Sequence, residues 1–222
     1  MAQFSRFFGL AISALLPLVN PLGSALVFVS LVGNAPIATY RVLARKIAIN
    51  TTLFLITIEL IGTALLKFFG ISLPVMQVSG GLVIAAMGWT LLNQAAAPNP
   101  NEERIADGAT ALDSLQKKAF YPFTFPLTAG PGCIVVMVTL SAHQSLKGIV
   151  PDIEAHAGIV VAVILLSIAV YLCYGHAPSI TARVPARTAH GILRVMAFVL
   201  LCIGVQITWN GVESMLKSVL HS

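Results

Sequence analysis

Charged residues are scarce in this chain. Only 9% of its 222 residues are Asp, Glu, Lys or Arg, whereas 57% are hydrophobic and the mean hydropathy is +0.90. A soluble domain usually carries about 25% charged residues. The scarcity of charge excludes an ordinary soluble domain and indicates an all-α membrane protein that crosses the bilayer several times.

Residue patterns typical of metal sites and catalytic sites are also missing. The three cysteines, Cys133, Cys173 and Cys202, lie in apolar stretches without metal-ligand spacing, and the five histidines form no i, i+4 pair. There is no His-Glu-x-x-His or Gly-x-Ser-x-Gly motif, and no pair of carboxylates lies at membrane depth. We therefore expect no metal, no cofactor and no enzymatic activity, and we assign the histidines no ligand role.

Six apolar stretches are long enough to cross a hydrocarbon core of about 30 Å, which takes roughly 20 helical residues. They cover about 9–32, 47–69, 73–93, 120–142, 155–175 and 192–214. Tryptophan and tyrosine fall mostly toward the ends of these stretches, as interfacial anchors do. We expect this anchoring role for Trp89, Trp209, Tyr121, Tyr171 and Tyr174.

Basic residues collect in loops 1, 3 and 5. Nine of the 13 lysines and arginines lie in or beside these loops, namely Arg41, Arg45, Lys46, Arg104, Lys117, Lys118, Arg183, Arg187 and Arg194. Cytoplasmic loops carry the excess of basic residues, so loops 1, 3 and 5 are predicted to be cytoplasmic and both termini periplasmic. The net charge of +5 therefore indicates topology rather than a nucleic-acid partner.

Proline and glycine interrupt the first and the fourth stretch. The first contains Asn20-Pro21-Leu22-Gly23, and the fourth contains Pro126-Leu127-Thr128-Ala129-Gly130-Pro131-Gly132. Proline removes a backbone donor, and in hydrocarbon such breaks survive only inside protein or beside a wet cavity. A single proline is more often a simple kink, but two breaks in corresponding spans favour the binding site of a transporter.

The order of these features divides the chain into two halves. Residues 1–94 and 120–222 each hold three spans with the broken one first, and residues 95–119 form a polar linker predicted to be cytoplasmic. With an odd number of spans per half, the second half enters the membrane from the opposite side. The predicted fold is therefore two inverted three-helix repeats, with helices 1 and 4 broken.

A helix that restarts after a break presents free N–H groups and the positive end of its dipole. Two such ends suit a carboxylate, and the unwound carbonyls before them suit an ammonium group, so the expected ligand is a small zwitterionic solute. Gln206 shares a face with Asn210 and either lines the same cavity or bonds another helix. The candidate substrate-binding residues are Asn20, Pro21, Gly23, Thr128, Gly130, Pro131, Gly132 and Gln206.

Glu59 is the clearest carboxyl at membrane depth, in the middle of the second stretch. An acidic residue there costs a few kcal/mol if it faces lipid, so it is expected to face the interior. Three roles fit this position: a proton-coupling residue, a partner of the substrate ammonium group, or a protonated structural donor to a neighbouring helix.

The sequences of both breaks, together with Gly80-Gly81 and the ending Gly204-Val205-Gln206 with Asn210-Gly211, resemble the MarC family of bacterial inner-membrane proteins. The resemblance runs over nearly the whole chain. It implies a multi-pass protein of the bacterial inner membrane and a transport role, since a relative in the family transports small neutral amino acids. One departure is Ala197, where similar proteins tend to have glycine.

These observations favour a secondary transporter of small neutral amino acids, such as glycine and alanine, working by alternating access with Glu59 as the proton-coupling candidate. The alternatives are an exporter or permeability protein for another small solute, drugs included, and a structural or regulatory membrane subunit. The expected partners are the zwitterionic solute and the lipid bilayer. Whether the protein is a monomer or a homo-oligomer stays open at this point.

Overall fold

A computed structural model describes residues 2–93, 115–144, 149–183 and 186–220, and within these ranges the chain is helical apart from short connections. No strand occurs in these ranges. The elements are α1 (Ala2–Val19), α2 (Pro21–Val32), α3 (Ile37–Phe68), α4 (Leu73–Asn93), the helical segment η1 (Ala119–Thr128), which extended residues interrupt, α6 (Pro131–Gln144), α7 (Ile149–Gly175), α8 (Ala177–Arg183) and α9 (Ala186–Leu220).

Five helical segments are long and apolar enough to cross a membrane, and the bent pair η1–α6 makes a sixth. Helices α1 and α2 together form the first of these segments, over Ala2–Val32. The sixth is bent by 69° between η1 and α6. The expectation of a multi-pass all-α protein is therefore confirmed, with a broken span in the fourth position.

Several helices extend beyond the apolar stretches that mark them in the sequence. Helix α3 begins at Ile37, ten residues before the expected start, and α9 covers Ala186–Leu220 instead of 192–214. Backbone hydrogen bonding continues into polar sequence, whereas hydropathy marks only the part that suits lipid. The short helix α8 was not expected, and most of the predicted linker, residues 95–114, lies outside the described residues.

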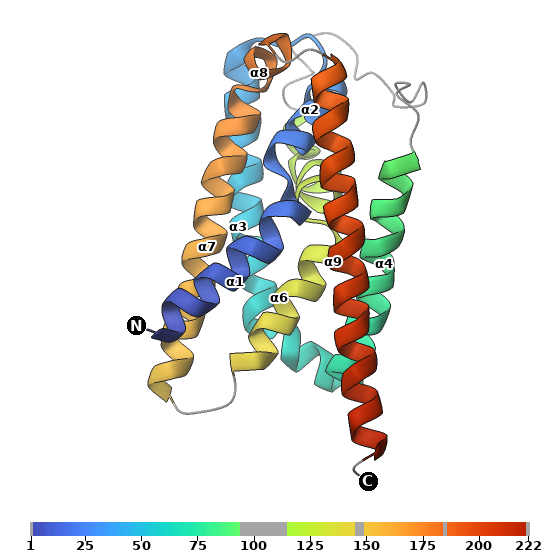
Figure 1. The fold of residues 1–222 in the computed structure, drawn as a ribbon. Coiled ribbons are helices and arrows are strands. Elements are labelled where there is room, and N and C mark those ends of the chain that lie inside the picture. Colours follow the sequence, from blue (N-terminus) through green and yellow to red (C-terminus); the bar gives the residue numbers. More distant parts are fainter. Residues whose placement is uncertain (1, 94–114, 145–148, 184–185, 221–222) are drawn as a thin grey trace.

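Both termini lie at the same end of the helix bundle (Figure 1). We call this the terminal end; α8 and the turn between α2 and α3 mark the opposite end. Helix α6 ends and α7 begins at the terminal end, and the turn between α3 and α4 lies there too. A shared side for both termini agrees with the topology predicted from the basic loops.

The packing partners of the two halves correspond. Helix α3 packs on α7 and α4 packs on α9, so the second and third spans of one half each meet their counterpart. The broken spans cross over: α1 and α2 pack on α7, while η1 and α6 pack on α3. Two inverted repeats would produce this exchange of partners, although the division into two repeats itself stays a prediction.

Helices α4 and α9 contact each other through their backbones. A Cβ atom added at Gly81 would lie 2.7 Å from the Gly204 carbonyl oxygen, and one at Gly88 would lie 2.8 Å from the Ala197 carbonyl oxygen. Small residues allow such close approach of membrane helices. Ala197, the departure noted in the sequence, is therefore buried in this contact.

Candidate functional site

The first break is at Asn20, between α1 and α2. Its backbone adopts the left-handed conformation (φ 41°), which asparagine tolerates better than most residues. The Asn20 side-chain oxygen accepts a hydrogen bond of 3.1 Å from the Gly23 N–H, so it caps α2, whose first residue is Pro21. Pro17 stays inside α1. The break therefore comes from the asparagine cap together with Pro21 rather than from Pro17.

Gly23 makes room for this cap. A Cβ atom at Gly23 would overlap the Asn20 side-chain amide. In this conformation the glycine is needed for the cap of its own helix, so the free approach of a ligand to Gly23 stays a prediction.

The second break is built from two consecutive tetrads, Tyr121-Pro122-Phe123-Thr124 and Phe125-Pro126-Leu127-Thr128. The residue before each proline is extended, as its ring requires, and both X-Pro bonds are cis. The threonine that ends each tetrad donates its hydroxyl to a carbonyl five residues earlier: Thr124 to Ala119 at 2.8 Å and Thr128 to Phe123 at 2.6 Å. The threonines thus supply donors in a segment where two prolines have none.

Glycines let the neighbouring helices approach the second break. A Cβ atom at Gly132 would lie 2.8 Å from the Leu18 side chain of α1 and 2.9 Å from the Ile84 side chain of α4. Gly130 lies at the bend, and Pro131 begins α6. Gly132 therefore lets α6 pack against two helices of the first half, α1 and α4.

The two breaks meet inside the bundle. The Ser24 hydroxyl, just after the first break, donates to the Val19 carbonyl at 2.9 Å and lies 3.4 Å from the Leu127 carbonyl oxygen of the second break. The Thr128 hydroxyl lies 2.8 Å from the hydroxyl of Tyr174 on α7. All these side chains are buried, so the breaks are packed against one another in this conformation.

Tyr174 corrects one expectation from the sequence. It is not an interfacial anchor, because its side chain is fully buried and its ring stacks on Phe28 with the centroids 4.6 Å apart. Phe28 also meets Phe123 of the second break edge-to-face at 5.3 Å. Neither Ser24 nor Tyr174 carried a sequence signal, because each meets its partner across the fold and not at a helical spacing.

Glu59 faces the interior, as its charge predicted. It is fully buried, and its Oε1 is hydrogen-bonded to Nδ1 of His156 on α7. The Ser141 hydroxyl of α6 donates to the Glu59 carbonyl at 2.7 Å, so three helices converge at this residue. The histidines were assigned no ligand role from the sequence, and this bond of His156 to Glu59 was not anticipated.

His156 borders a cavity of about 430 Å³ near the terminal end of α3, α6 and α7. Its side chain is 41% exposed, whereas that of Glu59 is fully enclosed. The polar and charged residues that line the cavity are Thr63, Lys67, Ser72, Ser141, Asp152 and His156. The hydrogen bond to His156 thus connects the buried Glu59 carboxyl to a polar cavity.

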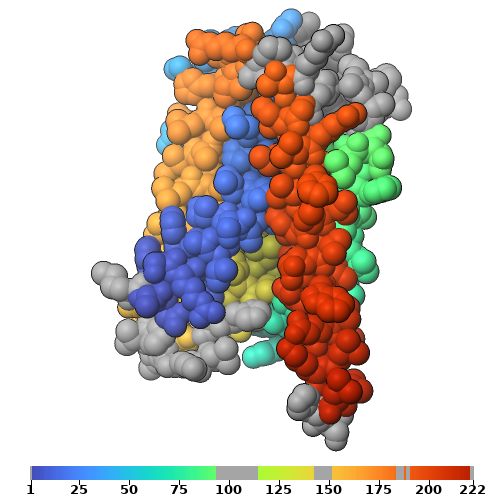
Figure 2. All heavy atoms as spheres, in the orientation of Figure 1, coloured from blue at the N-terminus to red at the C-terminus, as the bar shows by residue number. Residues whose placement is uncertain are grey.

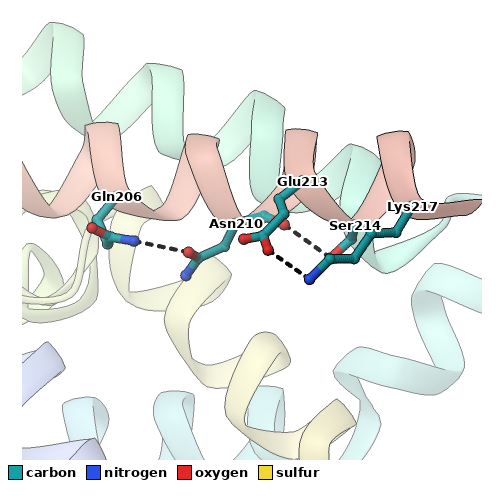
Figure 3. Close-up of polar contacts among 5 residues, drawn as sticks. All are labelled: Gln206, Asn210, Glu213, Ser214 and Lys217. Carbon is teal, nitrogen blue, oxygen red and sulfur yellow. Dashed lines mark hydrogen bonds and ion pairs between the residues drawn. The ribbon is translucent and has the colours of Figure 1, made fainter.

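Gln206 lies on an exposed face of α9. Its amide donates to the Asn210 side chain at 2.9 Å, and the same face continues through Ser214 and the ion pair of Glu213 with Lys217 (Figure 3). These bonds run along α9 and do not join Gln206 to the breaks. Part of α6 is visible between α1 and α9 (Figure 2), so these two helices leave it uncovered on this face.

No group of three or more His, Cys, Asp or Glu side chains that could hold a metal ion occurs in the described part of the chain. The candidate site therefore consists of backbone groups at two breaks, a few hydroxyls and amides, and the Glu59–His156 pair.

The architecture defines the class first: a multi-pass α-helical membrane protein in which two interrupted spans meet inside the bundle. Residues 5–216 match the MarC family of integral membrane proteins, and the chain belongs to this family. No solved structure matches the chain.

Relatives match over nearly their full length. The UPF0056 inner membrane protein MarC of Salmonella typhimurium is 32% identical over 228 residues, covering 98% of this chain and 99% of the relative. UPF0056 membrane protein MJ1677 of Methanocaldococcus jannaschii is 29% identical over 212 residues, covering 95% and 98%. Together with the membrane-spanning helices, these matches identify a multi-pass inner-membrane protein.

Proposed function

We propose that this protein is a secondary transporter of small neutral amino acids, such as glycine and alanine, and that it works by alternating access. The observation that carries the proposal is the meeting of the two breaks at the Ser24 hydroxyl and the Leu127 carbonyl. Interrupted spans that meet at the interface of two repeats are typical of substrate sites in secondary transporters.

The chemistry of the breaks suits a zwitterion. Helices α2 and α6 each restart at a proline, and their first N–H groups with the positive dipole end suit a carboxylate. The carbonyls of Val19, Phe123 and Leu127 already accept hydroxyl hydrogens or lie beside one, so they can accept from an ammonium group instead. A substrate would therefore replace bonds that side chains make in its absence.

The size of the site favours a small substrate. The groups at the breaks are buried, and large side chains such as Phe28 and Tyr174 pack directly beside them. A bulky drug would fit only if these rings moved apart. Glycine or alanine is small enough to fit where the hydrogen bonds at the breaks are exchanged for its own. This argument favours amino-acid transport over drug efflux.

Proton coupling forms the second part of the proposal. Glu59 is a buried carboxyl in a spanning helix, and intramembrane ionisable residues commonly serve ion pathways. Its bond to His156, whose two ring nitrogens can accept one proton and donate another, makes the pair suitable for taking up and releasing a proton.

The test is uptake of labelled glycine and alanine into proteoliposomes, with and without an imposed pH gradient. Asn20→Gly keeps the left-handed backbone but removes the side-chain oxygen that caps α2. Gly130→Leu places a large side chain at the bend. Both variants should abolish uptake while the protein stays folded and inserted. Ser79→Ala on an exposed face of α4 is the matched control and should transport normally. No saturable uptake by the correctly inserted unmodified protein would refute the substrate class and favour another small solute.

A further inference from the structure

The polar cavity at the terminal end lies close to the buried carboxyl of Glu59. It lies between α3, α6 and α7, and one of its lining residues, His156, is bonded to Glu59. The imidazole is partly exposed and the carboxyl is not, so His156 offers a proton in this cavity a route to Glu59.

We propose that His156 is the proton carrier between this cavity and Glu59. A neutral imidazole with hydrogen on Nδ1 donates to the Glu59 carboxylate. A proton from water in the cavity then binds Nε2, and the Nδ1 proton passes to Oε1. The products are a neutral carboxyl and a neutral imidazole with hydrogen on Nε2, so one proton has moved from the cavity to Glu59, and the reverse steps release it.

The charged neighbours support proton capture at this place. Asp152 lies four residues before His156 on α7, hence on the same face, and lines the same cavity. Among the described residues, no hydrogen-bond donor reaches its buried Oδ1. A carboxylate on this face of the cavity attracts a proton that enters it.

The remaining groups around the pair define its electrostatic setting. Lys67, on the same helix as Glu59, is the basic residue lining the cavity, and α6 contributes the uncharged Ser141 hydroxyl. The side chain of His143 on α6 lies outside the described ones. The described lining of the cavity thus combines Asp152, Lys67 and the imidazole of His156. This mixture of charges suits the transient binding of a proton better than the permanent binding of an ion.

The route opens at the terminal end, which the basic loops predict to be periplasmic. The inference rests on the proposed function for its physiological meaning, because it describes the coupling step of that transport. The proton transfer itself can be measured without any substrate, and this separates the two proposals.

The experiment follows the infrared carbonyl band of the Glu59 carboxyl after a rapid drop in pH, with the full-length protein in liposomes. Glu59→Gln identifies the band by removing it. His156→Ala should slow its appearance about a hundredfold, the lower end of what a positioned acid–base group contributes. Free imidazole in the buffer should restore the rate, because the cavity of about 430 Å³ is large enough to admit it.

Ser72→Ala, which changes another residue lining the cavity, is the matched control and should leave the rate unchanged. An unchanged rate in His156→Ala would overturn the proposal. A slowed rate that imidazole does not restore would also overturn it, since His156 would then only position Glu59. Failure of amino-acid uptake with these infrared results intact would reject the transport substrate alone.

Discussion

The bond between Thr128 and Tyr174 gives a sharp energetic test of how the breaks are held. Thr128 has one hydroxyl hydrogen, and it is donated to the Phe123 carbonyl at 2.6 Å. The 2.8 Å contact with Tyr174 must therefore have the tyrosine as donor and Thr128 as acceptor. This assignment makes the two single substitutions unequal.

Tyr174→Phe removes one donor and leaves the bond from Thr128 to Phe123 intact. We expect it to lower the free energy of unfolding by about 1 kcal/mol, the usual net value of one hydrogen bond. Thr128→Val has a similar shape but removes two hydrogen bonds, the one that the Phe123 carbonyl accepts and the one between Thr128 and Tyr174, whose hydroxyl keeps its interaction with Ser24. With about 1.5 kcal/mol for the carbonyl and about 1 kcal/mol for the bond to Tyr174, we expect a loss of about 2.5 kcal/mol.

The double variant should be less damaged than the sum of the singles. Both single substitutions remove the same bond between Thr128 and Tyr174, so the double variant should lose about as much as Thr128→Val alone, about 2.5 kcal/mol. Additive effects would give about 3.5 kcal/mol, and the difference of about 1 kcal/mol is the coupling between the two residues.

The assay is reversible unfolding of the detergent-solubilised protein by increasing SDS, followed by tryptophan fluorescence and circular dichroism. Thr128→Ser keeps the hydroxyl and is the matched control, expected within about 1 kcal/mol of the unmodified protein. Equal effects of the two singles, or additivity within about 0.5 kcal/mol, would refute the assigned direction of the bond.

Two further predictions concern the helix pair and the coupling residue. Gly204→Ala should destabilise the protein in the same unfolding assay, because its Cβ atom would overlap the backbone of α4 at Ala85. Gly9→Ala is the control: its Cβ atom would have no neighbour within 4 Å, so the change should be neutral or slightly stabilising. Glu59→Gln should flatten the pH profile of amino-acid uptake before it weakens substrate binding; an unchanged profile would remove Glu59 from the coupling step.

The sequence was most informative where local chemistry dictates structure. Asn20-Pro21 marks a break because proline lacks a donor and asparagine tolerates a left-handed backbone, and the structure confirms the break there. Glu59 was expected in the interior because lipid exposure of a carboxyl is costly, and it is fully buried. Both predictions need only the residue and its apolar surroundings.

Contacts between distant residues could not be predicted in this way. His156 is 97 positions from Glu59, and Tyr174 is 46 positions from Thr128. Neither pair has a helical spacing, and in a single sequence nothing relates one to the other. The segment η1 is an intermediate case, because its two Pro-containing tetrads are visible in the sequence but their hydrogen bonds over five residues are not.

The hydrogen bonds at the breaks and the backbone contacts between α4 and α9 differ in a way that constrains any transport cycle. At the breaks, Ser24 and Thr128 satisfy carbonyls with rotatable hydroxyls, and such bonds can be exchanged for those of a ligand. Between α4 and α9, backbone lies on backbone at Gly81 and Gly88, and no rotamer change can relax that contact. A rearrangement that exposes the breaks would therefore move α4 and α9 together, and a disulfide engineered between them should leave transport intact.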